Sequence, residues 1–281
     1  MGKSTPMTPA APALRSESWS WPPMMRASVG CHLLAFGTAV AVPGAVPWAI
    51  GAVVLNHVLL TAAGLTPRSS LLGQNLTRLP QAAATRHEVA ITIDDGPDPE
   101  VTPQVLDLLE AHGQRATFFC IAERVAAHPA LAREIVARGH SIQNHTARHP
   151  HNFSFLGPRG FEAEISRAQQ LLFDVTGERA SCFRAPAGLR NPFLAPVLHR
   201  LGLSLVSWTR RGFDTRERNP ATVLARLSKN LKAGDILLLH DGNAARTDSG
   251  RPVVLVVLPQ LLERLRSDGL RAVTLPEALA A

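Results

Sequence analysis

The stretch EVAITIDDG, residues 88–96, combines an apolar run with two adjacent aspartates and a glycine. An apolar run of this length that ends in Asp-Gly is typical of a buried strand entering a turn. Because adjacent strand residues point to opposite faces, a bend here would let one of Asp94 and Asp95 approach a metal ion while the other moves protons. The same residues also fit an ordinary acidic turn without a catalytic role. A functional interpretation of Asp94 and Asp95 therefore depends on further reactive residues elsewhere in the chain.

Similar apolar runs recur along the chain and alternate with helical periodicity. Thr102 and Pro103 open a helical stretch that ends before Gly113, and Pro129 opens another that ends before Gly139. Strands that alternate with helices predict a parallel α/β architecture. We expect seven strands, at residues 88–94, 116–120, 141–144, 181–184, 203–208, 235–240 and 271–275.

Reactive side chains follow several of these strands. In a parallel α/β fold, the carboxyl ends of the strands lie at one face and build the active site there. We therefore expect these side chains to converge. They are Asp94, Asp95, His145, His149, Arg184, Trp208, His240 and Asp241.

His145 and His149 stand four residues apart, close enough to bind one ion in a helix or tight turn. Thr146 excludes the zinc-protease helix motif, which needs Glu at that position. The spacing also fits a solvated or buried pair without metal. We expect His140 and His151 to be histidines of that structural kind, outside the site. Two imidazoles and one carboxylate would suit a divalent ion such as Zn²⁺ or Co²⁺, with a coordination position left for water.

The N-terminal part has a different character. Residues 27–67 contain no Lys, Arg, Asp or Glu, a run about twice the length that one membrane span of about 20 residues needs. We expect a polar leader at 1–26, a transmembrane segment at 27–67, a linker at 68–85 and a catalytic domain at 86–281. The transmembrane segment could be one span or a hairpin of 27–42 and 46–65, while a cleaved signal peptide fits its length poorly.

The flanking charges of this segment are balanced. Arg15 and Arg26 precede it, and Arg68 and Arg78 follow it, so the positive-inside rule favours no single crossing. The balance favours a hairpin that returns the catalytic domain to the side of the N-terminus. We expect the cytoplasmic membrane as the location and its lipid bilayer as a partner, with the side of the catalytic domain left open.

Overall composition excludes other classes. The net charge is +7, but residues 1–80 hold five basic residues and one acid, and no basic cluster interleaved with aromatics marks a nucleic-acid surface. Charged residues are only 18% of the chain and apolar ones 46%, which excludes a largely disordered protein. Cys31, Cys120 and Cys182 lack metal-type spacing, and we expect buried thiols without a disulfide.

Residues 86–281 resemble the polysaccharide deacetylases of the NodB-homology type, carbohydrate esterase family 4. Three motifs of that family read complete, as TIDDG at 92–96, HTARH at 145–149 and RAP at 184–186. A fourth is looser, with Trp208 followed by Asp214, and a fifth is LLLHD at 237–241. The resemblance implies a distorted (β/α)₇ barrel and metal-dependent hydrolysis of an N-acetyl group on an amino sugar of a polysaccharide or lipid-linked glycan, with release of acetate.

The resemblance also implies roles for the residues of the first three motifs. Asp95, His145 and His149 would hold the ion, for which Zn²⁺ is the first expectation. Asp94 would be the general base. Arg184 would orient Asp94 and keep it ionised, unless it forms a purely structural ion pair.

The later motifs would complete the machinery. His240 would be the general acid, held in place by Asp214. Trp208 and Leu239 would form an apolar pocket for the acetyl methyl group, although both also fit plain core positions.

Two departures from the family pattern concern the substrate groove. Pro186 is followed by Ala187 where the family has an aromatic residue, and Asp214 is followed by Thr215 where the family has Trp. Ala187 can still offer its backbone N–H to a developing oxyanion. The alternatives are a related metal hydrolase acting on N-formyl, O-acetyl or phosphoester groups, and a non-catalytic, membrane-held glycan-binding protein.

Overall fold

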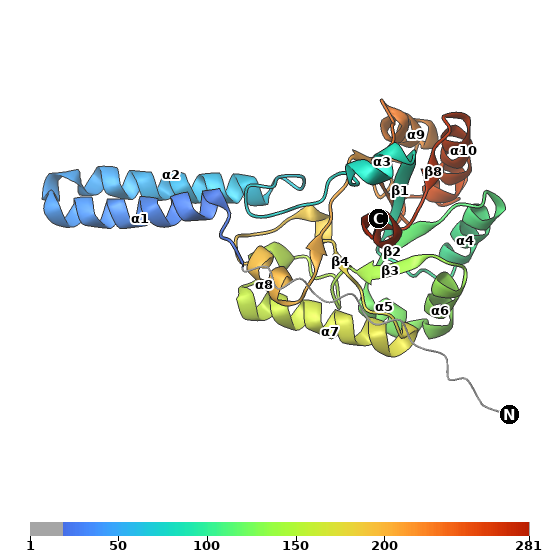
Figure 1. Cartoon of the computed structure of the whole chain (residues 1–281), viewed down its shortest axis with the longest axis horizontal. Helices are drawn as coiled ribbons and strands as arrows, with labels where there is room; N and C mark the ends of the chain where they lie inside the picture. The colour runs from blue at the N-terminus through green and yellow to red at the C-terminus, as the bar shows by residue number, and fades with distance from the viewer. Residues whose placement is uncertain (1–18, 281) are drawn as a thin grey trace.

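The computed structural model describes residues 19–280, which form a helical hairpin and an α/β domain. The hairpin projects away from the domain in Figure 1. It consists of α1 (Pro23–Ala41), the short 3₁₀ turn η1 (Pro43–Ala45) and α2 (Val46–Gly64). The uncharged run thus forms two helices, close to the bounds expected for a hairpin. Residues 1–18 of the expected polar leader lie outside the described residues.

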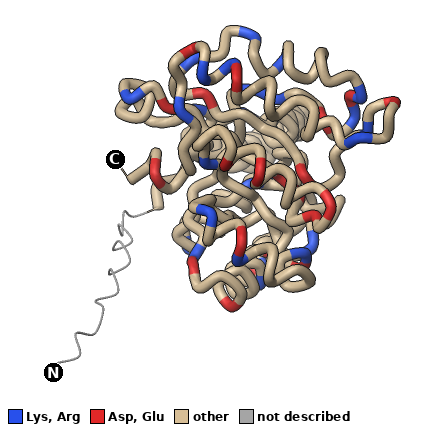
Figure 2. Tube along the Cα trace, turned by 90° about the vertical axis from the view of Figure 1, so that its right-hand side faces the viewer, with Lys and Arg blue, Asp and Glu red and all other residues tan. Residues whose placement is uncertain are grey.

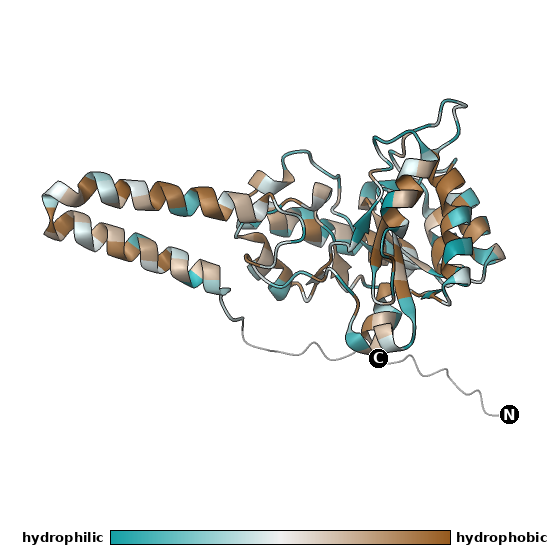
Figure 3. Ribbon diagram, turned by 90° about the horizontal axis from the view of Figure 1, so that it is seen from above, coloured by the Kyte–Doolittle hydropathy of each residue, from teal (hydrophilic) through white to brown (hydrophobic). Residues whose placement is uncertain are grey.

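Both helices of the hairpin are long and apolar enough to cross a membrane. Each has 19 residues, or about 28 Å at 1.5 Å per residue, and the hydrocarbon core is about 30 Å thick. Figure 3 shows apolar residues along both helices. The exposed apolar side chains include Leu33, Leu34, Phe36, Trp48 and Ile50.

Polar side chains of the hairpin meet between its two helices. Asn56 Nδ2 donates to Ser28 Oγ at 2.9 Å, and the Nε2 atoms of His32 and His57 lie 3.3 Å apart. Polar groups turned toward each other and apolar groups turned outward are the arrangement expected of helices packed in lipid.

The domain contains one curled sheet of eight strands in the order β5-β4-β3-β2-β1-β7-β6, with β8 paired to the start of β1. All of these strand pairs are parallel. The strands are β1 (Glu88–Asp94), β2 (Ala116–Cys120), β3 (Ser141–Asn144), β4 (Cys182–Phe183), β5 (Ser204–Leu205), β6 (Arg210–Arg211), β7 (Ile236–His240) and β8 (Arg271–Ala272).

The expected parallel α/β class is confirmed, with differences in the second half of the sheet. Strands expected at 181–184, 203–208 and 271–275 are shorter, and β6 was not expected at all. The chain leaves the strand ladder early because other segments take over its hydrogen bonds: Leu76 pairs with Val206, and Thr209 N donates to the Ile236 carbonyl. Because β6 consists of two arginines, no apolar run in the sequence predicts a strand there.

The segment expected to be a linker, 68–85, packs into the domain wall. Leu76 pairs with Val206 beside β5, and Arg78 pairs with Asp235 at the start of β7. The segment therefore bridges the open side of the sheet before α3 (Gln81–Thr85) leads into β1.

Helices cover the outer face of the sheet, as Figure 1 shows. They are α4 (Thr102–Ala111), α5 (Ala122–Ala127), α6 (Pro129–Ala137), α7 (Pro158–Thr176), α8 (Leu194–Arg200), α9 (Pro220–Ser228) and α10 (Val253–Ser267). The short 3₁₀ turns are η2 (Phe153–Phe155) and η3 (Pro186–Gly188), and α11 (Leu275–Leu279) packs on the inner face through Leu275 and Ala278. Alternate strand residues face the helices or the sheet interior. Thus Ile91 and Leu237 join the outer core, whereas Ala90 and Leu238 join the inner one.

The three cysteines are free. Cys120 and Cys182 are buried as expected, but Cys31 is half-exposed. That expectation was wrong for Cys31 because it lies in α1, whose side chains are largely uncovered by protein.

Candidate active site

The ends of β1 and β3 bring three potential metal ligands together. Asp95 Oδ1 lies 3.2 Å from His145 Nε2 and 3.4 Å from His149 Nε2. One ligand atom from each residue lies within 4.8 Å of the other two. Asp95 and His149 have positive φ angles of 73° and 57°, so the backbone turns sharply at both ligands. This donor set of two imidazole nitrogens and one carboxylate oxygen fits a divalent ion.

The protonation behaviour of Asp95 and His149 also suits metal binding. Burial raises the pKa of Asp95, but hydrogen bonding to His145 and the charges of the nearby histidines outweigh it and lower the pKa well below its usual range. Burial and the charge of His145 lower the pKa of His149 to about 4, which leaves its imidazole neutral at pH 7. Ionised carboxylate and neutral imidazole are the forms that bind metal. Burial would lower the pKa of His145, but its hydrogen bond to Asp95 and the charges of Asp94 and Asp95 raise it, so a bound ion must displace a proton there.

Further residues fix the ligands in place. The Nδ1–H of His145 donates to the Arg184 carbonyl at 2.8 Å, which directs Nε2 toward Asp95. Asn243 Nδ2 donates to Asp95 Oδ2 at 3.1 Å, and Arg124 Nη1 donates to the Asp95 backbone carbonyl at 2.9 Å. Neither Asn243 nor Arg124 belongs to the motifs that predict the site from the sequence.

Asp94 lies beside the triad and is held by Arg184. Arg184 Nη1 donates to Asp94 Oδ1 at 2.6 Å and to Thr92 Oγ1 at 2.9 Å, and the other carboxylate oxygen of Asp94 lies 3.9 Å from His145 Nε2. The remaining guanidinium donors of Arg184 bind backbone carbonyls, and its Cζ stacks 4.1 Å from the Phe119 ring centroid. Arg184 is thus fully buried with its charge paired.

His240 and Asp214 form a second buried pair. His240 Nδ1 donates to Asp214 Oδ1 at 2.9 Å, and the His240 backbone N–H donates to Asp214 Oδ2 at 2.7 Å. Burial would lower the pKa of His240, but the charge and hydrogen bond of Asp214, with help from Asp94 and Asp95, raise it to about 9. The imidazole is therefore a charged proton donor at neutral pH.

The two residues expected to form the acetyl pocket, Trp208 and Leu239, lie on opposite faces of the sheet. Trp208 belongs to the inner core, and Arg184 Cζ lies 6.0 Å from its ring. Leu239 is fully buried in the outer core beneath the helices, on the face of β7 opposite His240. Its assignment to the pocket was therefore wrong, because strand residues alternate in direction. Leu238, two residues before His240, faces inward and packs in the same cluster as Trp208.

The third motif supplies an exposed turn near the site. Pro186 is buried, whereas Ala187 is exposed and has a φ of 54°. Both lie in η3, directly after Arg184. Gly188 of the same turn lies against the Trp208 ring, so the turn borders the wall that carries Trp208.

Arg211 is a further cation near the site that the sequence analysis did not identify. Its Cζ lies 5.1 Å from the Trp208 ring centroid and 4.9 Å from that of Phe213. Burial lowers the pKa of Arg211, and the charges of Asp94 and Asp214 oppose that shift. Its buried Nε has no hydrogen-bond partner among the described residues.

Other polar residues named from the sequence have structural partners. Thr102 Oγ1 donates to Asp241 Oδ2 at 2.5 Å, and burial raises the pKa of Asp241 to about 7. His140 is buried away from the triad, and its Nδ1 accepts from the Ala116 backbone N–H at 3.1 Å. Asp241 thus ties the end of β7 to α4, and His140 belongs to the core.

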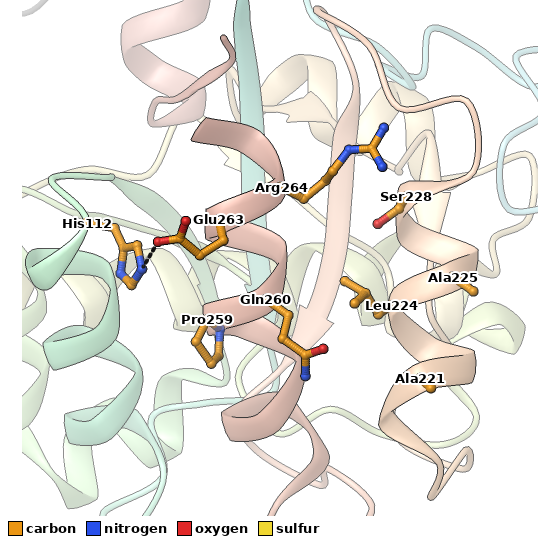
Figure 4. Close-up of a pocket in the computed structure, with 9 residues that line it drawn as sticks. All are labelled: His112, Ala221, Leu224, Ala225, Ser228, Pro259, Gln260, Glu263 and Arg264. Carbon is orange, nitrogen blue, oxygen red and sulfur yellow. Dashed lines mark ion pairs between the residues drawn. The ribbon is translucent and has the colours of Figure 1, made fainter. Parts of the chain in front are cut away.

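A separate surface pocket lies between α9 and α10 (Figure 4). His112 Nε2 and Glu263 Oε1 form an ion pair of 3.5 Å at its edge. None of the residues of the triad or of the two buried pairs lines this pocket.

Comparison with known proteins gives consistent matches. A family model described as polysaccharide deacetylase matches residues 81–206. A peptidoglycan-N-acetylglucosamine deacetylase of Bacillus cereus is 35% identical over 193 residues, covering 68% of this chain and 87% of that protein. A chitooligosaccharide deacetylase of Azorhizobium caulinodans is 34% identical over 214 residues, covering 74% and 100%. The structure of a family 4 carbohydrate esterase from Streptomyces lividans in complex with acetate matches with a TM-score of 0.60 and 31% identity, covering 66% of this chain and 91% of that one.

The curled parallel sheet with a carboxylate and imidazole site at its strand ends defines a hydrolase of carbohydrate amides. The chain belongs to the polysaccharide deacetylase family and is a carbohydrate N-deacetylase. The segment matched by the family model contains the triad, Asp94 and Arg184 but ends before Asp214 and His240.

Proposed function

We propose that the protein is a metal-dependent deacetylase that removes the acetyl group from an N-acetylated amino sugar of a glycan. Asp95, His145 and His149 hold one divalent ion, with Zn²⁺ as the first choice and Co²⁺ as an alternative. When bound, such an ion supplies Lewis acidity and lowers the pKa of water. The observation that carries the proposal is that Asp94 lies beside the triad and is paired across β1 and β7 with His240, so that a buried carboxylate and a buried imidazole stand at the same strand ends.

The two flanking groups divide the proton transfers. Asp94 takes a proton from the attacking water, and its pairing with Arg184 fixes the carboxylate in one orientation. His240 gives its proton to the departing amine, and Asp214 holds the imidazole with Nε2 free to do so. We assign the backbone N–H of Ala187 to the negative charge that develops on the acetamide oxygen.

The substrate class follows from relatives and from the site together. The relatives are named for peptidoglycan N-acetylglucosamine and chitooligosaccharide, and both contain N-acetylated amino sugars. Trp208 and the inward-facing Leu238 are the side chains we assign to the acetyl methyl group. We assign no nucleic-acid partner, because basic and acidic residues are interspersed on the face of the domain that Figure 2 shows.

We also propose that the hairpin anchors the enzyme in the cytoplasmic membrane. The length of α1 and α2, their exposed apolar residues and the polar contacts between them support two spans. Two spans leave the catalytic domain on the same side as the N-terminus.

Acetate release from N,N′-diacetylchitobiose by the purified full-length protein tests the function. We expect release that stops on chelation and returns when Zn²⁺ or Co²⁺ is added. Chelator-resistant release would contradict metal dependence, and binding of the sugar without any release would favour a non-catalytic glycan-binding protein. Faster hydrolysis of N-formyl, O-acetyl or phosphoester analogues would favour the related hydrolases.

A further inference from the structure

The hairpin is joined rigidly to the catalytic domain at its last residue. The Arg190 backbone N–H donates to the Gly64 carbonyl at 3.1 Å, and a Cβ at Gly64 would overlap the Arg190 carbonyl. Arg190 is itself buried, and its Nη2 donates to the Ser69 carbonyl. The end of α2 therefore has one fixed position on the domain.

The residues directly after α2 reach the rim of the candidate active site. Ser207 Oγ donates to the Pro67 carbonyl at 2.6 Å, and Arg68 Nη1 donates to the Thr209 carbonyl at 3.2 Å. Ser207 and Thr209 flank Trp208 in the chain. The segment 66–68 is thus part of the wall that carries the Trp208 ring.

The same segment packs on the turn that bears Ala187. Gly188 has a φ of +74°, and a Cβ there would meet Pro67 and the Trp208 ring at 2.6 and 2.7 Å. Only glycine fits between the two rings at this backbone conformation. Pro67 therefore packs against Gly188. This glycine directly follows Ala187, the position at which the family pattern has an aromatic side chain.

This arrangement fixes the distance between the site and the base of the hairpin. Two residues separate Gly64 from Pro67, and the three steps along the chain span at most about 10 Å. Trp19 and Trp21 lie just before α1, and Trp21 is half exposed, as expected of side chains at a membrane–water interface. With α1 and α2 in the bilayer, the rim formed by Pro67 and Ala187 lies at the lipid headgroups.

We propose that the substrate is an N-acetylated amino sugar attached to a membrane lipid, presented to the site from the surface of the bilayer. This inference rests on the proposed deacetylase function. A sugar fixed to a lipid headgroup is confined to the layer at which the rim lies. Such a sugar also needs no long groove lined by aromatic residues. This agrees with the small side chains Ala187 and Thr215, which stand at positions where the family has aromatic residues.

The activity test uses full-length protein in phosphatidylcholine vesicles that contain a polyprenyl-diphosphate-linked N-acetylglucosamine, with N,N′-diacetylchitobiose in solution as the comparison. Gly64→Val forces the hairpin out of its fixed position, while Gly51→Val, in the same helix with no neighbour within 4 Å, is the matched control. We expect Gly64→Val to lower turnover of the lipid-linked sugar by about tenfold or more relative to chitobiose, because a displaced site no longer meets the sugar. Gly51→Val should change neither rate.

The outcomes separate the inference from the proposed function. If wild-type protein releases acetate from chitobiose but not from the lipid-linked sugar, or if Gly64→Val leaves the ratio of the two rates unchanged, the inference is overturned. If metal-loaded wild type releases acetate from neither, the proposed function itself fails.

A second measurement does not depend on activity. A fluorophore on Ala187→Cys, in a Cys31→Ser background, should be quenched strongly by a nitroxide on the lipid headgroups. The same label on Ser267→Cys, at the exposed end of α10 and on the side of the domain away from the hairpin in Figure 1, should be quenched weakly. Equal quenching at both positions would overturn the membrane-facing orientation.

Discussion

Arg184 Nη1 lies 2.6 Å from Asp94 Oδ1, and both side chains are buried. This pair ties the end of β1 to the end of β4 and leaves the other oxygen of Asp94 turned toward His145. A carboxylate held in this way beside the ligands, without being one of them, suits a general base.

Asp94→Asn should therefore separate metal binding from turnover. We expect the variant to keep its metal, because the triad is intact, while kcat falls by roughly two or more powers of ten. Metal analysis and acetate release on the same sample check this. Near-wild-type activity that remains sensitive to a chelator would require the roles of Asp94 and Asp95 to be reassigned.

Replacement of either histidine of the triad should remove both metal and activity. His145→Ala and His149→Ala each delete one of three ligands, so the affinity for the ion should collapse. His151→Ala is the control, since His151 is exposed outside the triad. A stoichiometric metal ion in the double variant His145→Ala/His149→Ala would disprove the triad.

Asp214→Asn should change the pH dependence of turnover. The general acid must carry its proton, so activity is lost as the pH rises through the pKa of His240, which is raised to about 9 in this structure. Removing the charge of Asp214 lowers that pKa, and the alkaline limb of the kcat profile should move to lower pH. An unchanged alkaline limb would show that a different group titrates there.

The hairpin predicts the topology of fusion proteins. Alkaline phosphatase fused at residue 281 should be inactive in cells if the N-terminus is cytoplasmic, because two spans return the chain to its starting side. A fusion at Gly44, between the two helices, should then be active. Full activity of the fusion at residue 281 would refute the hairpin as a pair of spans.

Much of the fold could be predicted because its central strands are long apolar runs. The expected ranges 88–94, 116–120 and 141–144 coincide with β1, β2 and β3. The strands β4, β5 and β6 have only two residues each, and Leu76 of the preceding segment pairs with Val206 directly after β5. Such contacts leave no periodic signal in the sequence.

The residues of the site also differ in how well the sequence predicts them. The ligands and proton-transfer groups follow strand ends and could be located by motif. Leu239 directly precedes His240 in the strand, so the alternation of strand residues already assigns Leu238, and not Leu239, to the face of His240. Asn243 could not be found, since its position near the site depends on how the loop after β7 folds back. Arg211 could not be found either, because it lies in β6, a two-residue strand that no apolar run predicts.

The most direct test of the account is a titration of metal-free, full-length protein with Zn²⁺ while acetate release from N,N′-diacetylchitobiose is followed. Activity should rise in proportion to added metal and stop rising at one equivalent per chain, as one triad requires. Activity that is already maximal in the metal-free protein, or that never appears at any metal concentration, would contradict the claim that Asp95, His145 and His149 form the catalytic metal site.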